Sequence, residues 1–295
     1  MARPLCVLLL FSISHFPFPR AAAQPVSVVD DRGKAVSLDR PAQRIVTLAP
    51  GLTELAYAAG AGGRLVGVAR FSDFPPAARA IAQVGDAARV DFERIVALAP
   101  ELILAWRSGN SARDVERLEQ LGYAVYVSEP RRLEHIARAL RALGGLAGTA
   151  AEADAAAAEF GGAIMALRRG HEGARTVRVF YEMWRKPLLT VNGAHLISDV
   201  IALCGGLNVF RDARPFTPTV SAEALLAARP EVVLGGSRPG GDKGYARGWQ
   251  AQALAPLSNI PAFYVDPDRI QRATPRVAEG AKAVCAALDE VRSRR

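Results

Sequence analysis

A partial internal repeat limits the folds that this 295-residue chain can adopt. The segment Asp91–Leu104 (DFERIVALAPELIL) is matched later in the chain by Ser221–Leu234 (SAEALLAARPEVVL). Each copy has a residue that favours the N-cap position, then a short helical pattern, a proline and a buried apolar strand. Two such copies, so far apart in the sequence, predict two similar lobes.

Short apolar runs alternate with helical patterns in both halves of the chain. The expected strands are 44–48, 65–68, 102–105 and 124–127 in the first half, and 177–181, 232–235 and 262–265 in the second. The second half also has helical patterns near 195–203, 221–228 and 273–292. Strands that alternate with helices are typical of parallel sheets built from βαβ units. We therefore expect an α/β protein with two lobes.

An alanine-rich segment, Gly148–Arg169, lies between the two series of strands. Alanine has the highest helix propensity, whereas flexible linkers are rich in glycine and serine. A helix of about 20 residues would span roughly 30 Å at its usual rise of about 1.5 Å per residue, enough to bridge two lobes. The expected organisation is a leader at 1–23, a first lobe at 24–147, an interlobe helix at 148–173 and a second lobe at 174–295.

Residues 1–23 have the pattern of a secretory signal peptide. Arg3 precedes an apolar run, Leu5–Ile13, and the segment ends on Ala21–Ala23 before Gln24. The run is far shorter than the roughly 20 residues that cross a bilayer as a helix, and small residues of this kind precede a cleavage site. We expect export and cleavage, with an uncleaved anchor or a buried helix as the alternative.

Cleavage at this point would remove Cys6 and leave Cys204 and Cys285. Two cysteines in an oxidising compartment favour one disulfide, and a bridge that closes so long a loop contributes about 4 kcal/mol through chain entropy. Two buried free thiols are the alternative. Isolated cysteines without C-x-x-C spacing do not indicate a zinc site.

Composition and charge describe a globular protein without a nucleic-acid partner. Half of the residues (50%) are apolar, which is enough for an ample core. The formal net charge is +8, of which Arg3 and Arg20 would leave with the leader. Positive charge can attract nucleic acid, but the arginines are interspersed with acidic residues, and basic runs are doublets such as Arg294–Arg295.

The sequence has no recognisable catalytic or cofactor motif. The glycine clusters at 60–63 and 235–244 match neither a P-loop nor a dinucleotide fold, and no G-x-S-x-G elbow occurs. The histidines of the mature chain, His135, His171 and His195, are too widely spaced for a zinc motif. Only His195, which follows a turn, is expected at a helix start facing a cleft. We expect a protein that is not an enzyme, with no cofactor and no metal; an exported hydrolase is the alternative class.

Several short stretches, taken together in their order and spacing, are characteristic of one protein family: Thr47–Leu55, Phe71–Pro76, Phe92–Leu98, Ala105–Asn110, Cys204–Phe210, Arg272–Arg276 and Cys285. Through them the chain, from about Arg44 to Leu288, resembles periplasmic vitamin B12-binding proteins of the BtuF type. These belong to a larger group that also carries iron siderophores and haem. The resemblance implies two Rossmann-like lobes with parallel sheets, joined by a single long helix, with the ligand in the cleft between them.

The resemblance also implies a transport role in the periplasm. We expect a monomer that captures cobalamin or a related corrinoid and delivers it to the permease dimer of an ABC transporter with its ATPase subunits. Glu93 and Glu223, one in each copy of the repeat, fall where glutamates of the family dock onto permease arginines. Acids that simply favour the first turn of a helix are the alternative. Cys204 and Cys285 match a disulfide that the family can carry.

Ligand-binding positions carried over from the family lie on both walls of the cleft: Pro50, Gly51, Phe71, Trp106, Trp184, Phe216, Asp268 and Arg272. One tryptophan of the family is replaced here by Ala87, and the region of a second reads Pro215–Thr217. Phe216 or Trp184, which follows the strand ending near Tyr181, offers a replacement. A haem or ferric-siderophore carrier of the same fold is the alternative. It predicts iron coordination by His195 or Tyr181, or arginines that line the cleft.

Overall fold

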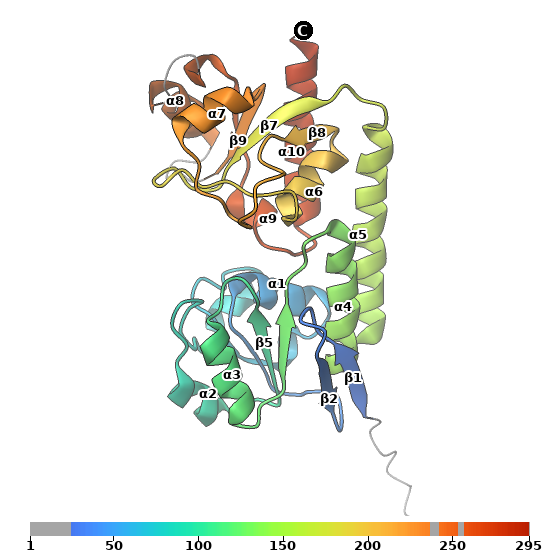
Figure 1. Cartoon of the computed structure of the whole chain (residues 1–295). Helices are drawn as coiled ribbons and strands as arrows, with labels where there is room; N and C mark the ends of the chain where they lie inside the picture. Colours follow the sequence, from blue (N-terminus) through green and yellow to red (C-terminus); the bar gives the residue numbers. More distant parts are fainter. Residues whose placement is uncertain (1–24, 237–241, 253–256, 295) are drawn as a thin grey trace, which may run out of the picture.

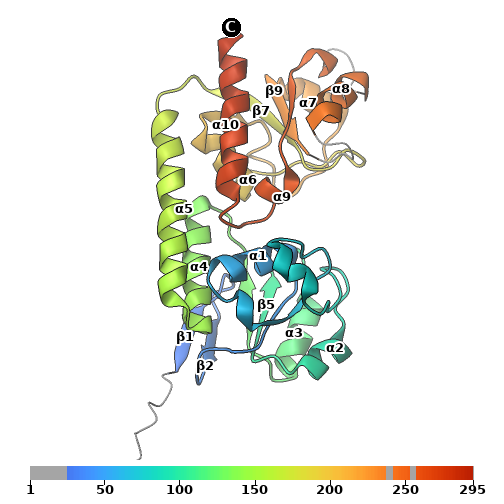
Figure 2. The same ribbon diagram turned by 180° about the vertical axis from the view of Figure 1, so that it is seen from behind.

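The computed structural model describes residues 25–236, 242–252 and 257–294. They form two α/β lobes, one above the other in Figures 1 and 2, each built around its own four-stranded sheet. The expected leader lies outside the described residues, as does part of the glycine cluster at 235–244. In the described ranges, no helix has the length and apolar character needed to span a membrane.

The first lobe contains a parallel sheet in the order β4-β3-β5-β6. Its strands are β3 (Ile45–Thr47), β4 (Leu65–Val68), β5 (Leu102–Trp106) and β6 (Val125–Ser128), and its helices are α1 (Pro50–Ala58), α2 (Phe92–Leu98), α3 (Ala112–Gln120) and α4 (Leu133–Ala147), with 3-10 turns at Gly62–Arg64 and Pro76–Ala80. An antiparallel hairpin precedes the sheet and consists of β1 (Val26–Val29) and β2 (Ala35–Leu38). Every residue of β3 and β6 is buried, as expected for parallel strands that are covered on both faces.

The second lobe repeats this plan with a parallel sheet in the order β10-β9-β7-β8. Its strands are β7 (Val177–Glu182), β8 (Gly206–Asn208), β9 (Val232–Gly235) and β10 (Ala262–Tyr264), and its helices are α6 (Leu196–Leu203), α7 (Ala222–Ala228), α8 (Asp242–Gln252), α9 (Pro267–Ile270) and α10 (Val277–Ser293), with a 3-10 turn at Leu257–Asn259. The predicted fold class, two α/β lobes with parallel sheets, is confirmed.

The alanine-rich segment forms the helix α5 (Ala150–Gly170), close to its predicted bounds. It packs against α4 of the first lobe and α10 of the second, and Figures 1 and 2 show it along one side of both lobes. A Cβ placed on Gly144 of α4 would lie 2.3 Å from the Cβ of Ala153, so the two helices approach closely because these residues are small. The buried residues of α5 form one stripe: Ala153, Ala157, Phe160 and Ile164.

The sequence repeat is also a structural repeat. Helices α2 and α7 each have seven residues, and the side chains of their N-cap residues, Asp91 and Ser221, accept hydrogen bonds from backbone N–H groups of the first turn. Both helices end on a non-glycine residue in the left-handed region, with φ of 42° at Ala99 and 44° at Arg229. The two lobes therefore present α2 and α7 in the same local geometry.

An arginine at the start of β3 and another at the start of β7 support these helix ends: Arg44 directly precedes β3, and Arg178 is the second residue of β7. Arg44 donates hydrogen bonds to the carbonyls of Leu98 and Ala99, and Arg178 does the same for the last two carbonyls at the end of α7. Carbonyl groups at a helix C-terminus lack partners within the helix, so both arginines replace bonds that the short helices cannot make themselves.

The second lobe contains a disulfide between Cys204 and Cys285, which confirms the predicted pairing. Cys204 is the C-cap residue of α6, and Cys285 is a buried residue of α10. The bridge therefore fastens the end of one buried helix to the middle of another.

Candidate ligand-binding cavity

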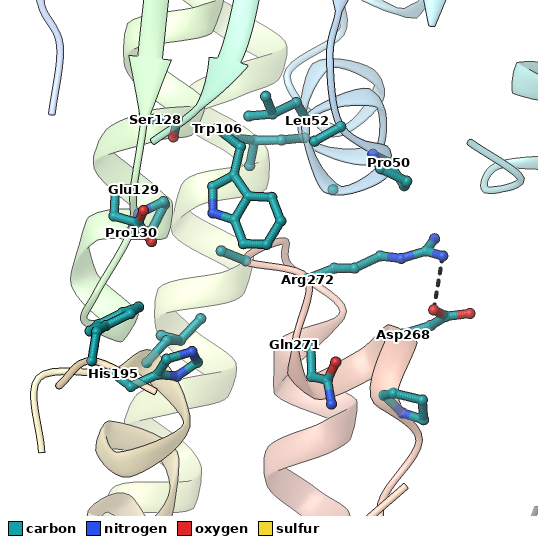
Figure 3. A pocket seen from close by; sticks show the side chains of 17 residues that line it. Pro50, Leu52, Trp106, Ser128, Glu129, Pro130, His195, Asp268, Gln271 and Arg272 are labelled. Atoms are coloured by element: carbon teal, nitrogen blue, oxygen red, sulfur yellow. Dashed lines mark ion pairs between the residues drawn. The ribbon is translucent and has the colours of Figure 1, made fainter. Parts of the chain in front are cut away.

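A cavity of about 250 Å³ lies between the lobes (Figure 3). The carboxyl ends of β5 and β6, at Trp106 and Ser128, lie in its wall, and this edge of a parallel sheet is where α/β folds usually bind ligands. The first lobe lines it with Ala49, Pro50, Gly51, Leu52, Leu55, Trp106, Ser128, Glu129 and Pro130, and the second with His195, Leu196, Phe216, Pro267, Asp268, Gln271, Arg272 and Ala273.

Two glycines lie in or beside the first-lobe wall. A Cβ on Gly51 would lie 3.5 Å from the Cβ of Arg272 in the other lobe, an ordinary van der Waals contact, so the two lobes are neighbours at this position. A Cβ on Gly109 would lie 1.8 Å from the Trp106 ring, so a side chain there would displace the indole. Trp106 is the last residue of β5 and is 39% exposed. Its backbone N–H donates to the Asn110 side chain at 2.7 Å, which fixes the turn after the strand.

Two neighbouring, tilted rings form part of the second-lobe wall. The imidazole of His195 and the ring of Phe216 lie with their centroids 4.7 Å apart and an angle of 32° between their planes. The guanidinium of Arg131 lies 5.0 Å from the centroid of Phe216, in the range of a cation–π contact. The cavity thus has an indole on one lobe and two tilted rings on the other.

His195 is the N-cap residue of α6, and its position fixes its tautomer. The Nδ1 atom accepts a hydrogen bond from the backbone N–H of Ile197 at 3.1 Å. In a neutral imidazole the other nitrogen, Nε2, then carries the proton. Burial, and then the charge of Arg131, lower the pKa of His195 to about 4. His195 is therefore neutral near pH 7 and presents a donor at Nε2.

Arg272 lies on the second-lobe wall and is surrounded by carboxylates. Its guanidinium nitrogens lie 2.7 Å from Glu54, 3.0 Å from Asp73 and 2.8 Å from Asp268. Burial raises the pKa of Asp73, but the hydrogen bond and charge of Arg272 outweigh it, and the net pKa is below its ordinary value. The dashed line in Figure 3 marks the pair with Asp268, which comes from the same lobe. The other two carboxylates come from the first lobe, so Arg272 connects the lobes.

Glu54 of α1 is the buried centre of this connection and is 4% exposed. Its carboxylate accepts hydrogen bonds from Arg272, from Arg276 at 3.1 Å and from the Thr274 hydroxyl at 3.2 Å. The guanidinium of Arg276 also lies 4.0 Å from the centroid of the Phe74 ring in the first lobe. We call Glu54, Arg272, Thr274 and Arg276 the interlobe ion cluster.

Residues 45–255 match the sequence profile of the family described as periplasmic binding protein. The chain belongs to this family. It is 36% identical over 248 residues to the vitamin B12-binding protein of Vibrio cholerae serotype O1 (strain O395), covering 84% of this chain and 90% of that protein. It is 34% identical over 277 residues to the vitamin B12-binding protein of Yersinia pestis (strain Pestoides F), covering 94% and 95%.

Solved structures of periplasmic binding proteins share the fold. The crystal structure of the periplasmic vitamin B12 binding protein BtuF of Vibrio cholerae superimposes with a TM-score of 0.77 at 34% identity, over 85% of this chain and 98% of that one. The periplasmic heme-binding protein RhuT from Roseiflexus sp. RS-1 gives a TM-score of 0.73 at 21% identity, over 84% and 98%. At that identity the second likeness concerns the fold alone.

The structure brings together most of the ligand-binding positions that the family resemblance predicted. The cavity is lined by Pro50, Gly51, Trp106, Phe216, Asp268 and Arg272. The other two predicted aromatics do not line it. Phe71 is 67% exposed with a left-handed φ of 67°, and Trp184 is 54% exposed, with its indole N–H donating to the carbonyl of Lys186. Both side chains are therefore exposed and lie outside the lining of this cavity, and their contact with a ligand stays a prediction.

Sequence reasoning missed several lining residues, notably Ser128, Glu129 and Gln271. A signal for the first two was available, because they directly follow a predicted buried strand, and the carboxyl ends of parallel strands meet at the ligand-binding edge. Among the described residues, no group of three or more His, Cys, Asp or Glu side chains is arranged to hold a metal ion.

Glu93 and Glu223 lie outside the cavity, each exposed in the first turn of its short helix. Hydrogen bonding by its own backbone, and then by the Ser221 hydroxyl, lowers the pKa of Glu223. Figures 1 and 2 both show α2 and α7 on the side of the molecule opposite α5. The two glutamates thus have equivalent positions, one on each lobe.

Proposed function

We propose that this protein is a periplasmic solute-binding protein that captures cobalamin or a related corrinoid between its lobes and delivers it to an ABC-transporter permease. The observation that carries this proposal is the interlobe cavity, in a chain that is 34–36% identical over most of its length to vitamin B12-binding proteins. No bond is made or broken in this role, and the protein acts without a cofactor, as a binding protein rather than an enzyme.

The cavity suits part of a large, mostly apolar ring. Pro50, Leu52, Leu55, Trp106 and Phe216 supply apolar and aromatic surface, and burying such surface contributes about 25 cal/mol per Å². Polar groups at Asp268, Gln271 and Arg272 are placed to orient the ligand. A whole corrinoid is larger than a cavity of about 250 Å³, so in this proposal part of the ligand projects from the cleft, or the lobes separate to admit it.

A haem carrier would coordinate iron, but the two candidate side chains, Tyr181 and His195, are not in a suitable state to bind it. Tyr181 is fully buried and accepts a hydrogen bond from Gln271, and burial raises its pKa, which disfavours the phenolate that binds iron. His195 has its Nδ1 lone pair engaged with a backbone N–H, so Nε2 carries a proton and has no lone pair for a metal. These observations favour a corrinoid over haem.

Transfer to the permease is assigned to Glu93 and Glu223. Their equivalent positions on α2 and α7 support contacts with basic residues of a permease dimer, with its ATPase subunits on the other side of the membrane. The proposed working parts are 24–147 and 174–295 as the two lobes and 148–173 as the helix between them. Export relies on the leader at 1–23, which is cleaved before Gln24, and the exported protein is a monomer.

Isothermal titration calorimetry on the protein recovered from the periplasm tests the proposed ligand. Cyanocobalamin, haemin and a ferric hydroxamate siderophore are compared under the same conditions. The proposal expects saturable one-to-one binding of cyanocobalamin, at least about tenfold tighter than that of the other two, a difference of about 1.4 kcal/mol. Preference for haemin or the siderophore, or no binding of cyanocobalamin, refutes it.

A further inference from the structure

Two buried side chains of the cavity wall each have a polar atom that lacks a partner within the part of the chain that the structure describes. Ser128 is fully buried and Glu129 is 7% exposed, and both line the cavity. The Oγ atom of Ser128 and the Oε2 atom of Glu129 have no hydrogen-bond partner among the described residues. Buried polar atoms are nearly always paired in folded proteins. An unpaired hydroxyl and carboxyl oxygen beside one cavity therefore point to a partner that arrives with the ligand.

The backbone at this wall is held firmly from outside the cavity. The N–H of Glu129 donates to the Asp31 carboxylate at 2.6 Å, and the N–H of Asp31 donates to the Val127 carbonyl at 3.0 Å. The Ser128 carbonyl accepts from the N–H of Arg107 at 3.1 Å. Because these bonds fix the segment before any ligand binds, little ordering is needed when a ligand does bind.

The unpaired oxygens lie on one side of the cavity, and charged groups lie on the other. Figure 3 shows Ser128 and Glu129 with Trp106 toward one side, while Arg272 and Asp268 lie across from them. The guanidinium of Arg272 is already bonded to carboxylates. The first-lobe wall thus offers acceptors, together with the one hydroxyl donor of Ser128.

We propose that Ser128 and Glu129 form a specificity site for carboxamide groups on the rim of the ligand. This inference rests on the proposed function and extends it to the choice among macrocycles. A primary amide carries two N–H donors and one carbonyl acceptor, which complement the Glu129 oxygen and the Ser128 hydroxyl. The rim of cobalamin carries acetamide and propionamide groups, whereas haem carries propionates. A carboxylate on the rim of the ligand has no N–H group to donate to Glu129 and carries a negative charge. It would therefore leave the Glu129 Oε2 atom unpaired.

Calorimetry with two kinds of probe tests the specificity site. The probes are cyanocobalamin and its monocarboxylic acids, in each of which one rim amide has been hydrolysed. The wild-type protein is expected to bind at least one monoacid at least about tenfold more weakly than cyanocobalamin. The variant Glu129→Gln is expected to bind cyanocobalamin about 10- to 100-fold more weakly, which is the range for a lost hydrogen bond to a charged group. It should also bind that monoacid nearly as well as it binds cyanocobalamin, because a glutamine amide can donate to a carboxylate.

Two further variants separate a specific role from a general effect on folding. Ser128→Ala removes the hydroxyl with little change in volume and is expected to weaken cyanocobalamin binding by roughly three- to tenfold. Glu134→Gln changes an exposed glutamate in the first turn of α4, outside the cavity, and is the matched control with unchanged affinity.

The outcomes distinguish the two proposals. If the wild-type protein binds no cyanocobalamin, the proposed function fails and this inference fails with it. If the wild-type protein binds but Glu129→Gln and Ser128→Ala keep its affinity within twofold, only the specificity site is refuted. The site is refuted also if Glu129→Gln discriminates against the monoacids as strongly as the wild type does.

Discussion

Glu54 offers a direct test of whether the interlobe ion cluster stabilises the protein. The carboxylate is 4% exposed and accepts three hydrogen bonds, from Arg272, Arg276 and Thr274. Hydrogen bonds to charged groups contribute about 1.5–3 kcal/mol each but are not additive, and removal of one partner from a buried ion pair typically costs about 3–5 kcal/mol. Without Glu54, Arg272 still has its ion pairs with Asp73 and Asp268. We therefore expect Glu54→Leu to lower the free energy of unfolding by about 3–5 kcal/mol.

Urea unfolding followed by circular dichroism, with ligand absent, measures this loss. Tryptophan fluorescence provides a second probe, since Trp106 lies in the first lobe and Trp249 in the second. Asp268→Asn is the matched control: its side chain is 46% exposed, and a surface pair of this kind contributes up to about 1 kcal/mol. If Glu54→Leu and Asp268→Asn reduce the free energy of unfolding by similar amounts, the cluster is not the stabilising element that its burial indicates.

Three more predictions follow from the caps, the disulfide and the docking helices. The folded pKa of His195 is about 4, against 6.5 for the free side chain, so only the unfolded chain takes up this proton between those values. The free energy of unfolding, measured by urea titration, should therefore fall by about 3 kcal/mol from pH 6.5 to pH 4 because of this histidine. His195→Asn keeps an N-cap acceptor and should lose this part of the pH dependence. If the pH dependence of the variant equals that of the wild type, His195 is not its source. Replacing Cys204 and Cys285 with serine should lower the free energy of unfolding by about 4 kcal/mol, and a midpoint unchanged by the replacement would contradict it. Replacing Glu93 and Glu223 with arginine should abolish corrinoid uptake by cells while cyanocobalamin binding in calorimetry stays at wild-type strength; persistent uptake would exclude these glutamates from docking.

The sequence predicted those helices whose formation depends on residues close together in the chain. The repeat predicted α2 and α7 because an N-cap residue, a short helix and a following proline all act within about ten residues of sequence. The alanine content of α5 predicted a helix because propensity adds up along a segment. By contrast, β8 has the sequence Gly206–Asn208 without a β-branched residue. It is a strand only because it pairs with β7 and because the buried Asn208 amide donates to the Val191 carbonyl.

The cavity needed more than local patterns. Glu54 and Arg272 are separated by 218 residues in the chain, and no periodicity connects them. Phe71 was predicted at the cleft from its position in the family and Trp184 as a replacement for a tryptophan that this chain lacks, but residue type does not determine whether a side chain joins the cavity lining. The structure exposes both to solvent. Glu129 follows a predicted strand, but the sequence does not show that its side chain is buried beside the cavity.

Helix α6 connects the cavity wall to the disulfide. His195, at the cavity, is its N-cap residue, and Cys204 of the disulfide is its C-cap residue, with eight helical residues between them. At about 1.5 Å per residue, a rigid rod of roughly 12 Å separates them. The disulfide therefore anchors the far end of the same helix whose first end lies at the cavity wall, and we expect its reduction to weaken ligand binding even with every contact residue intact.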